Sequence, residues 1–298
     1  MSAFADLKKN AEKLNESLTD SFKDQREKKA DDRFWYPATD KAGNATATVR
    51  FLPAPAGEDL PYVTLYRNAF KDEKTGRWYI ENNLRTLGQQ DPTDEYNREL
   101  WNTGTEENQK LYRHQKAKAE YFTNVYIIKD STNPENEGQV KIFKFGPWMY
   151  KFIKSAMIPE FEDQEPIPVF DLWKGADFKI RIGKKGEHRN YDRSEWASPS
   201  EFMGGDDAKL EEIWLQANSL KEFIDPKNFK TYDELKKRFY NVIGLDGGTT
   251  VRSKAEAIPS EEPKPLKQSV DEDDDIPFNV GSDDDDGDDY FAKLVNED

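Results

Sequence analysis

The sequence predicts an α+β protein with a β-rich body, a helical arm before it and a disordered acidic tail after it. From Arg33 onward, short runs of β-branched and aromatic residues alternate with turn formers, which is typical of strands. Capped amphipathic segments interrupt these runs. Beyond about Val251 the chain consists mainly of Pro, Ser, Glu, Lys and Asp, which bury too little apolar surface to fold. We therefore expect an arm over 1–30, a core over 31–250 and a tail over 251–298.

The negative charge of the chain is concentrated in the tail. The 298 residues carry 59 acidic and 44 basic side chains, a net charge of −15. Sixteen acids and four bases lie from Lys254 onward, so this segment alone carries −12 and residues 1–253 carry −3. The low isoelectric point therefore does not exclude a polyanionic partner for the body.

The absence of cysteine excludes disulfides, thiol nucleophiles and cysteine-ligated zinc or iron–sulfur clusters. The start of the chain is already charged, and no apolar run approaches the roughly 20 residues of a membrane span. We expect a cytoplasmic protein without a signal peptide or membrane anchor.

Residues 3–29 place apolar side chains at steps of three and four, which puts one thin stripe on a helix. The stripe consists of Phe4, Leu7, Ala11, Leu14, Leu18 and Phe22. Such a stripe is too narrow to hold a core by itself. Two interpretations stay open: a solvated helix packed on its own body, or an arm that docks on another molecule.

Period-two patterns and turn signals define the expected strands. They cover residues 45–52, 63–66, 66–70, 77–80, 121–129, 139–145 and 178–182. We expect three hairpins: the first two runs pair across a Pro-rich turn with Gly57, the next two flank the 72–76 loop, and 121–129 pairs with 139–145.

Apolar spacing and end signals predict three helices, at residues 147–157, 209–220 and 231–243. Pro147 suits a first helical position. Thr231 stands three residues before Glu234, which is the spacing of a capping box, and Gly244 suits a helix end.

Signals for catalysis are weak. The chain has no phosphate-binding glycine loop and no nucleophile elbow, and its two histidines, His114 and His188, have no patterned acid partner. Asp177-Phe178-Lys179, with Asp171 upstream, superficially matches some metal-dependent nucleases. The same string also fits a strand in which Lys179 and Arg181 form a row that faces solvent or phosphates. We expect no enzyme.

Basic residues interleaved with aromatic ones are the more informative pattern. Residues 110–154 carry nine bases against four acids, and residues 174–193 carry seven against three. Single-stranded nucleic acid needs this mixture, because cations attract phosphates while rings stack on unpaired bases. The alternative is that the rings form a core and the cations a solvated rim.

An ordered series of short strings carries a family resemblance. They are Gly43-Asn44, Val49-Arg50-Phe51-Leu52-Pro53, Trp78-Tyr79-Ile80-Glu81, Pro134-Glu135-Asn136-Glu137-Gly138, Trp173-Lys174-Gly175-Ala176 and Asn190-Tyr191-Asp192. Over residues 33–245 the chain resembles the gene 32-type single-stranded DNA-binding proteins of T-even-like bacteriophages. The resemblance implies an OB-fold core, an N-terminal arm for cooperative self-association and an acidic C-terminal tail.

The resemblance also implies site residues. The rings that would stack on bases are Trp101, Tyr112, Tyr121, Phe143 and Tyr191, and the cations between them include Lys110, Arg113, Lys116 and Lys118. We add the basic residues Lys144, Lys179, Arg181 and Arg189 to the expected DNA-binding set. Self-association would use the arm residues Leu7, Lys8, Lys9 and Leu14.

The family commonly carries a zinc module of one histidine and three cysteines. Here Asn68, Asn83, Thr93 and Tyr96 stand at about those places. These side chains do not build a tetrahedral zinc site, so we expect no metal and no other cofactor.

The tail contains the string Asp273, Asp274, Asp275, Ile276, Pro277 and Phe278. It resembles the C-terminal tip of bacterial single-stranded DNA-binding proteins, which recruits replication and repair enzymes. Three interpretations stay open: a solubilising tail, a segment that occupies the basic groove when DNA is absent, and a docking motif for partner proteins.

Together these features predict a non-enzymatic, sequence-tolerant, cooperative coat for single-stranded DNA. It would act in phage DNA replication, recombination and repair, in the cytoplasm of the infected bacterial host. The alternative is an acidic DNA mimic or interaction hub that acts mainly through its tail.

Overall fold

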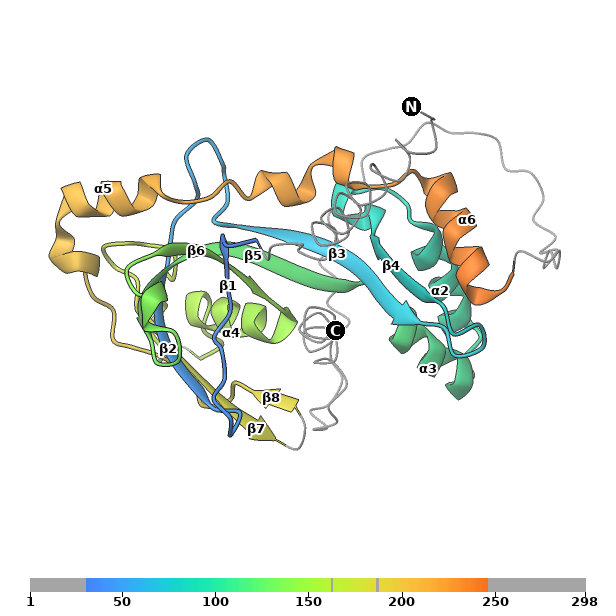
Figure 1. Cartoon of the computed structure of the whole chain (residues 1–298), viewed down its shortest axis with the longest axis horizontal. Helices are drawn as coiled ribbons and strands as arrows, with labels where there is room; N and C mark the ends of the chain where they lie inside the picture. The colour runs from blue at the N-terminus through green and yellow to red at the C-terminus, as the bar shows by residue number, and fades with distance from the viewer. Residues whose placement is uncertain (1–30, 162, 186–187, 246–298) are drawn as a thin grey trace, which may run out of the picture. The chain divides into compact units, whose positions relative to one another are not determined.

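The computed structural model describes residues 31–161, 163–185 and 188–245 (Figure 1). The chain divides into two units, of which the first ends at Trp35 and contributes the short strand β1 (Phe34–Trp35). The second begins at Tyr36 and contains every other element. The predicted arm and the predicted tail lie outside the described residues. The described part is a mixed α+β structure with a large sheet, as predicted.

Strand β5 (Lys118–Asp130) is the centre of the sheet (Figure 1). One edge of it pairs with β6 (Val140–Phe145), as predicted. The other edge pairs first with β3 (Tyr62–Lys71) and then with β2 (Ala45–Phe51), all antiparallel. The predicted hairpin between β2 and β3 is therefore wrong, because the two strands lie in succession along one edge of β5.

The remaining strands extend both ends of this arrangement. Strand β7 (Phe178–Lys185) pairs with the free edge of β2, and β8 (His188–Asn190) and β9 (Glu195–Trp196) pair with β7. Strand β4 (Trp78–Asn82) pairs with the end of β3 around the predicted 72–76 loop. In that loop Asp72 accepts hydrogen bonds from the backbone of Lys74 and Thr75, and Gly76 takes a φ of 68°. A positive φ explains the glycine.

Three helices match the predictions in place. They are α4 (Pro147–Met157), α5 (Asp207–Leu215) and α6 (Tyr232–Ile243). Thr231 and Glu234 form the predicted capping box of α6, and Gly244 closes the helix with a φ of 75°. Helix α5 ends five residues early, because Asn218 leaves the helix to exchange hydrogen bonds of 2.9 Å with the side chain of Asn124.

Two further helices were not predicted. They are α2 (Pro92–Asn102) and α3 (Glu106–Gln115), and both begin with clear signals. The Asp91 side chain accepts from the backbone of Thr93, and Thr105 accepts from the backbone of Asn108. Short 3₁₀ turns complete the structure at Leu84–Leu87 (η1), Pro134–Asn136 (η2), Phe202–Gly205 (η3), Lys221–Ile224 (η4) and Pro226–Asn228 (η5). None of the helices in the described ranges is long and apolar enough to cross a membrane.

The apolar interior comprises separate clusters. Strands β2, β5 and β7 contribute fully buried side chains such as Val49, Ile127 and Ile180. A second cluster joins the β3–β4 hairpin to α6 through Phe70, Tyr79, Phe239 and Val242. The hairpin, α2, α3 and α6 thus pack as one lobe beside the main sheet (Figure 1).

Candidate nucleic-acid interface

Helices α2 and α3 bring together two of the predicted stacking residues. Trp101 lies at the end of α2 and Tyr112 lies on α3, and their ring centroids are 5.0 Å apart. Trp101 remains 45% exposed although it is large and apolar. An exposed indole that is held by a second ring offers a π-face on which an unpaired base can stack.

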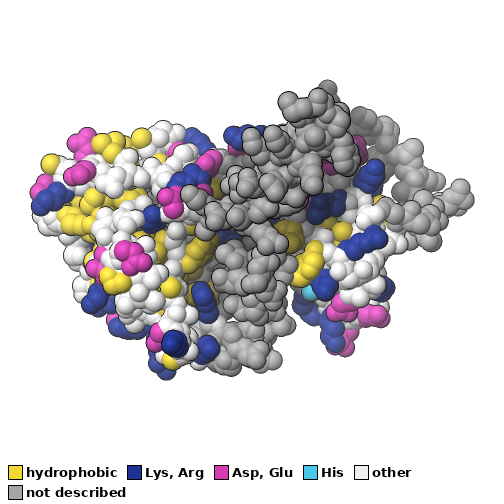
Figure 2. All heavy atoms as spheres, viewed as in Figure 1, with side chains coloured by type: hydrophobic (Ala, Val, Ile, Leu, Met, Phe, Trp, Pro, Cys, Tyr) yellow, Lys and Arg dark blue, Asp and Glu magenta, His cyan; other side chains and the backbone are white. Residues whose placement is uncertain are grey.

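Predicted cations accompany this pair along α3 and into β5. Lys110 and Arg113 are exposed on α3, Lys116 caps its C-terminus, and Lys118 is the first residue of β5. Lys110 forms an exposed ion pair of 3.2 Å with Glu106. Exposed pairs of this kind contribute little energy, so Lys110 can exchange its partner for a phosphate. Figure 2 shows Lys and Arg side chains spread over this helical part, with carboxylates among them.

Tyr121 and Phe143 lie in the interior and not on an open surface. Their exposed fractions are 9% and 4%. The Tyr121 ring stacks on Tyr150 at 4.3 Å and lies 5.5 Å from Phe145, and burial raises its pKa. Their stacking on DNA stays a prediction, and the structure gives them an evident role in supporting the sheet.

Lys144 forms a largely buried ion pair with Glu120. Its ammonium group lies 2.8 Å from Glu120 Oε1, and only 13% of its side chain is exposed. Arg67 approaches the other oxygen of Glu120 at 3.8 Å. A phosphate would therefore have to compete with Glu120 for Lys144, which sets it apart from the exposed cations of α3.

A second basic and aromatic group lies on β7 and just after β8. Lys179 and Arg181 both contact Glu195, at 3.8 and 2.7 Å, and the hydrogen bond from Arg181 lowers the pKa of Glu195. Both bases are nearly half exposed, whereas Arg189 is partly buried. Tyr191 follows β8, and its ring centroid is 6.0 Å from that of Trp148.

Trp148 is a candidate that the sequence reasoning missed. It stands at the second position of α4, where it stacks on Phe152 at 5.4 Å and stays 42% exposed. Phe152 in turn stacks on Trp196, which packs on buried Phe178. A tryptophan directly after the helix-starting Pro147 was the available signal. The successive ring contacts from Trp148 to buried Phe178 therefore support the exposed indole.

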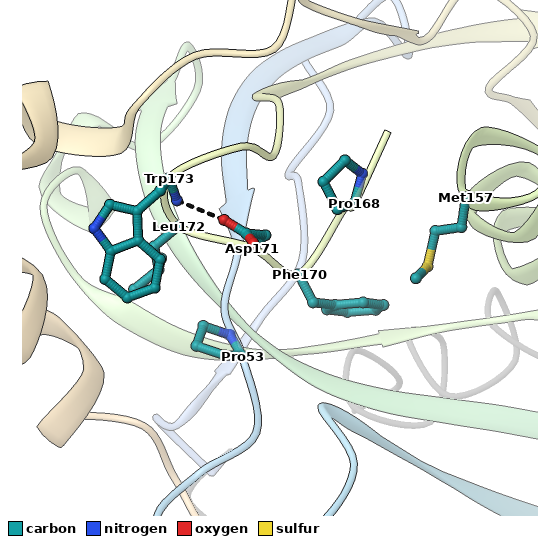
Figure 3. Close-up of a pocket in the computed structure, with 7 residues that line it drawn as sticks. All are labelled: Pro53, Met157, Pro168, Phe170, Asp171, Leu172 and Trp173. Carbon is teal, nitrogen blue, oxygen red and sulfur yellow. Dashed lines mark hydrogen bonds between the residues drawn. The ribbon is translucent and has the colours of Figure 1, made fainter. Parts of the chain in front are cut away.

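The unit that begins at Tyr36 also contains an apolar pocket of about 340 Å³ (Figure 3). Its lining residues are Pro53, Met157, Pro168, Phe170, Asp171, Leu172 and Trp173. The Asp171 carboxylate accepts from the backbone of Trp173 and Lys174 at 2.7 Å, so it shapes the loop. The surface of the pocket is mainly apolar.

Asp171 and Asp177, which suggested a nuclease, form contacts within the protein. Asp177 accepts a hydrogen bond of 3.2 Å from Arg50, whose side chain is completely buried. The same guanidinium donates to the carbonyls of Asp171, Leu172 and Ser200. Burial lowers the pKa of Arg50, while Asp177 opposes this effect. Asp177 is thus the counter-ion of a buried arginine, and the nuclease alternative loses its central residue.

At the four positions where the family resemblance implies zinc ligands, the side chains contact other protein groups. Asn83 Nδ2 donates to Asn68 Oδ1 at 2.9 Å, and Asn68 Nδ2 donates to the Gln115 carbonyl at 2.9 Å. Thr93 Oγ1 donates to the Tyr79 hydroxyl, and Tyr96 packs edge-on against Phe239. No thiolate or imidazole is present at these four positions, and the two amides already bond to each other. Nor do the described ranges hold any group of three His, Cys, Asp or Glu side chains that could bind a metal.

The remaining predicted residues lie outside the described ranges. They are Leu7, Lys8, Lys9 and Leu14 of the arm and Asp273, Asp274, Asp275, Ile276, Pro277 and Phe278 of the tail. Their roles in self-association and partner binding stay predictions.

Comparison with known proteins places the chain in a family. Residues 43–243 match the family described as "gp32 DNA binding protein like". The single-stranded DNA-binding protein of Enterobacteria phage T2 is 34% identical over 216 residues, which are 70% of each chain. That of Enterobacteria phage T4 is 32% identical over 264 residues, which are 85% of this chain and 83% of the T4 protein. This chain therefore belongs to the gp32-like DNA-binding protein family.

Proposed function

We propose that the protein binds single-stranded DNA, without chemistry and without sequence preference. Family membership and the exposed Trp101–Tyr112 pair beside the cations of α3 carry this conclusion. The two relatives named above are both single-stranded DNA-binding proteins. Its expected setting is phage DNA replication, recombination and repair in the cytoplasm of the infected host.

Binding divides into two kinds of contact. Lys110, Arg113, Lys116 and Lys118 attract phosphates, which releases counterions and makes the affinity depend on salt. Trp101 and Tyr112 stack on bases, which every base allows because every base has a π-face. Trp148 and Tyr191 offer a second stacking position. No contact needs a base-specific hydrogen bond, so the coat accepts any sequence.

The strand arrangement supports an OB-fold core. An OB-fold is a five-stranded Greek-key barrel that is partly open. Here the antiparallel strands β2, β3, β5, β6 and β7 form one connected sheet, in which β5 pairs with β3 and then with β2 along one edge. OB-folds bind single strands on such a surface.

The decisive experiment compares single-stranded with duplex DNA. Filter binding of full-length protein to a labelled oligo(dT), and to a duplex of the same length, should show tighter binding to the single strand by orders of magnitude at moderate salt. Binding should weaken as salt rises. An acidic DNA mimic or hub would bind neither substrate, so failure to retain oligo(dT) would contradict the proposal.

We further propose that the arm and the tail regulate coating. Arm residues 1–30 would contact a neighbouring copy. Residues 254–298 of the tail, with a net charge of −12, would compete with DNA for the cations and would dock replication and repair proteins when released. Deletion of residues 254–298 should tighten binding at low salt, and deletion of 1–30 should reduce cooperativity on long oligonucleotides. If the variant that lacks residues 254–298 bound DNA with the same affinity as the full-length protein at every salt concentration, competition by the tail would be refuted.

A further inference from the structure

The lobe that carries the Trp101–Tyr112 pair has a polar interior. Seven of the twelve buried polar side chains among the described residues belong to it: Asn68, Asp72, Asn83, Asp91, Thr93, Asn97 and Gln115. Buried polar groups are stable where they find hydrogen-bond partners. Asn68, Asn83, Asp91 and Thr93 find such partners and form a network, whereas among the described residues no hydrogen bond reaches the Asn97 amide or Gln115 Oε1.

Two amides form the centre of this network. Asn68 on β3 donates to the carbonyl of Gln115, the last residue of α3. Asn83, just before η1, donates from one nitrogen to Asn68 Oδ1 at 2.9 Å and to Asp94 Oδ1 of α2 at 3.2 Å. A chain of three hydrogen bonds thus joins α3, β3 and α2.

Asp91 fixes the other side of the same junction. Its two carboxylate oxygens accept from the backbone of Leu84 at 3.0 Å and of Thr93 at 2.8 Å. The first bond holds η1 and the second caps α2. The N-terminus of α2 therefore has a defined position relative to Asn83, and Trp101 stands at the other end of the same helix.

We propose that this network, defined by Asn68, Asn83, Asp91 and Asp94, closes the lobe without a metal ion, and that Asn68 and Asn83 are positioning residues for the Trp101–Tyr112 pair. It takes over the cross-linking task that zinc performs where cysteine and histidine are present. Only the DNA measurements below rest on the proposed function.

The first test concerns metal. Full-length protein, purified without added zinc or chelator, is examined by elemental analysis and by thermal unfolding with and without EDTA. The proposal expects substoichiometric zinc and the same melting temperature in both buffers. Stoichiometric zinc, together with a melting temperature that falls in EDTA, would overturn it.

The second test removes the hydrogen bonds that Asn83 donates and then restores a donor at position 94. Asn83→Asp removes both donated hydrogen bonds and sets a second carboxylate against Asp94. It should weaken oligo(dT) binding by about fivefold or more at a temperature where circular dichroism shows native helix content. Adding Asp94→Asn returns a donor to the pair and should recover part of that loss, because the new amide can donate to the carboxylate at position 83.

A matched control separates the network from a general charge effect. Asn133→Asp makes the same charge change in the loop between β5 and β6, and it should leave oligo(dT) binding within twofold of the wild type. Wild-type affinity in Asn83→Asp, or a loss that Asp94→Asn leaves unrepaired, would overturn the positioning role. If the unaltered protein fails to bind oligo(dT), the proposed function fails instead, and the zinc and melting measurements still decide the structural part.

Discussion

The indole of Trp101 and the phenol ring of Tyr112 pack at a centroid distance of 5.0 Å, although they stand on different helices. Helix α2 ends one residue after Trp101, and α3 begins four residues later. The pair therefore depends on how the two helices are held against each other. This relationship makes the lobe beside the main sheet an essential part of the candidate DNA surface.

Trp101→Ala should weaken binding to oligo(dT) by about 1–3 kcal/mol, which is the usual contribution of one stacked base. The slope of log affinity against log salt should stay the same, because no phosphate contact is removed. Trp101→Phe keeps a π-face and should retain most of the affinity. Fluorescence titrations of the three proteins over a salt series measure both quantities. Equal losses in Ala and Phe would contradict a stacking role.

Lys116→Gln and Lys118→Gln should each reduce the salt slope by about 0.7, the value for one phosphate contact on a single strand. Both residues flank the junction of α3 and β5, and Lys116 is exposed. Lys209→Gln on α5 is the control, since Lys209 is exposed and paired with Asp206 at 3.2 Å. If all three variants changed the slope alike, the assignment of phosphate contacts to this junction would be wrong.

Asp177→Ala should lower the free energy of unfolding by about 2 kcal/mol, because it leaves the buried Arg50 without its counter-ion. Arg50 keeps three carbonyl acceptors, which limits the loss. Urea unfolding measures the effect, and Glu195→Gln on the exposed surface should leave the midpoint unchanged. Neither the wild type nor Asp177→Ala should cleave single-stranded DNA in magnesium; cleavage that this variant abolished would revive the nuclease alternative.

The stability of the lobe should depend on Asp94 through pH. Burial and the neighbouring Asp91 raise the pKa of Asp94 to about 6, against opposing effects of Arg85, Asn83 and Arg98. A raised pKa means that the folded state takes up the proton first, so this stabilisation is present at low pH and is lost as pH rises through 6. The wild type should therefore gain about 1 kcal/mol relative to Asp94→Asn between pH 8 and pH 5.3. Urea unfolding of both proteins at each pH measures this gain. A difference in free energy of unfolding between the wild type and Asp94→Asn that stayed constant over this range would contradict the prediction.

Several elements were predictable because their signals are local. The capping box at Thr231 and Glu234, the turn at Gly76 and the β5–β6 pair all depend on residues close in the chain. The signals of α2 and α3 were also local, namely Asp91 before Pro92 and Thr105 before Glu106. They were missed because both helices consist mainly of polar residues, and their buried side chains are largely polar as well.

The charge partition, the α+β class and the absence of thiol chemistry follow from the sequence, because composition and local periodicity are properties of the chain. The family resemblance came from the ordered series of short strings. The tertiary structure alone decided that β5 stands between β2 and β6, that Tyr121 and Phe143 are buried, and that Asn83 meets Asn68 and Asp94. Alternation along a strand says which side chains share a face, but not which distant strand will cover that face. Burial and long-range hydrogen bonds are settled only when the elements pack.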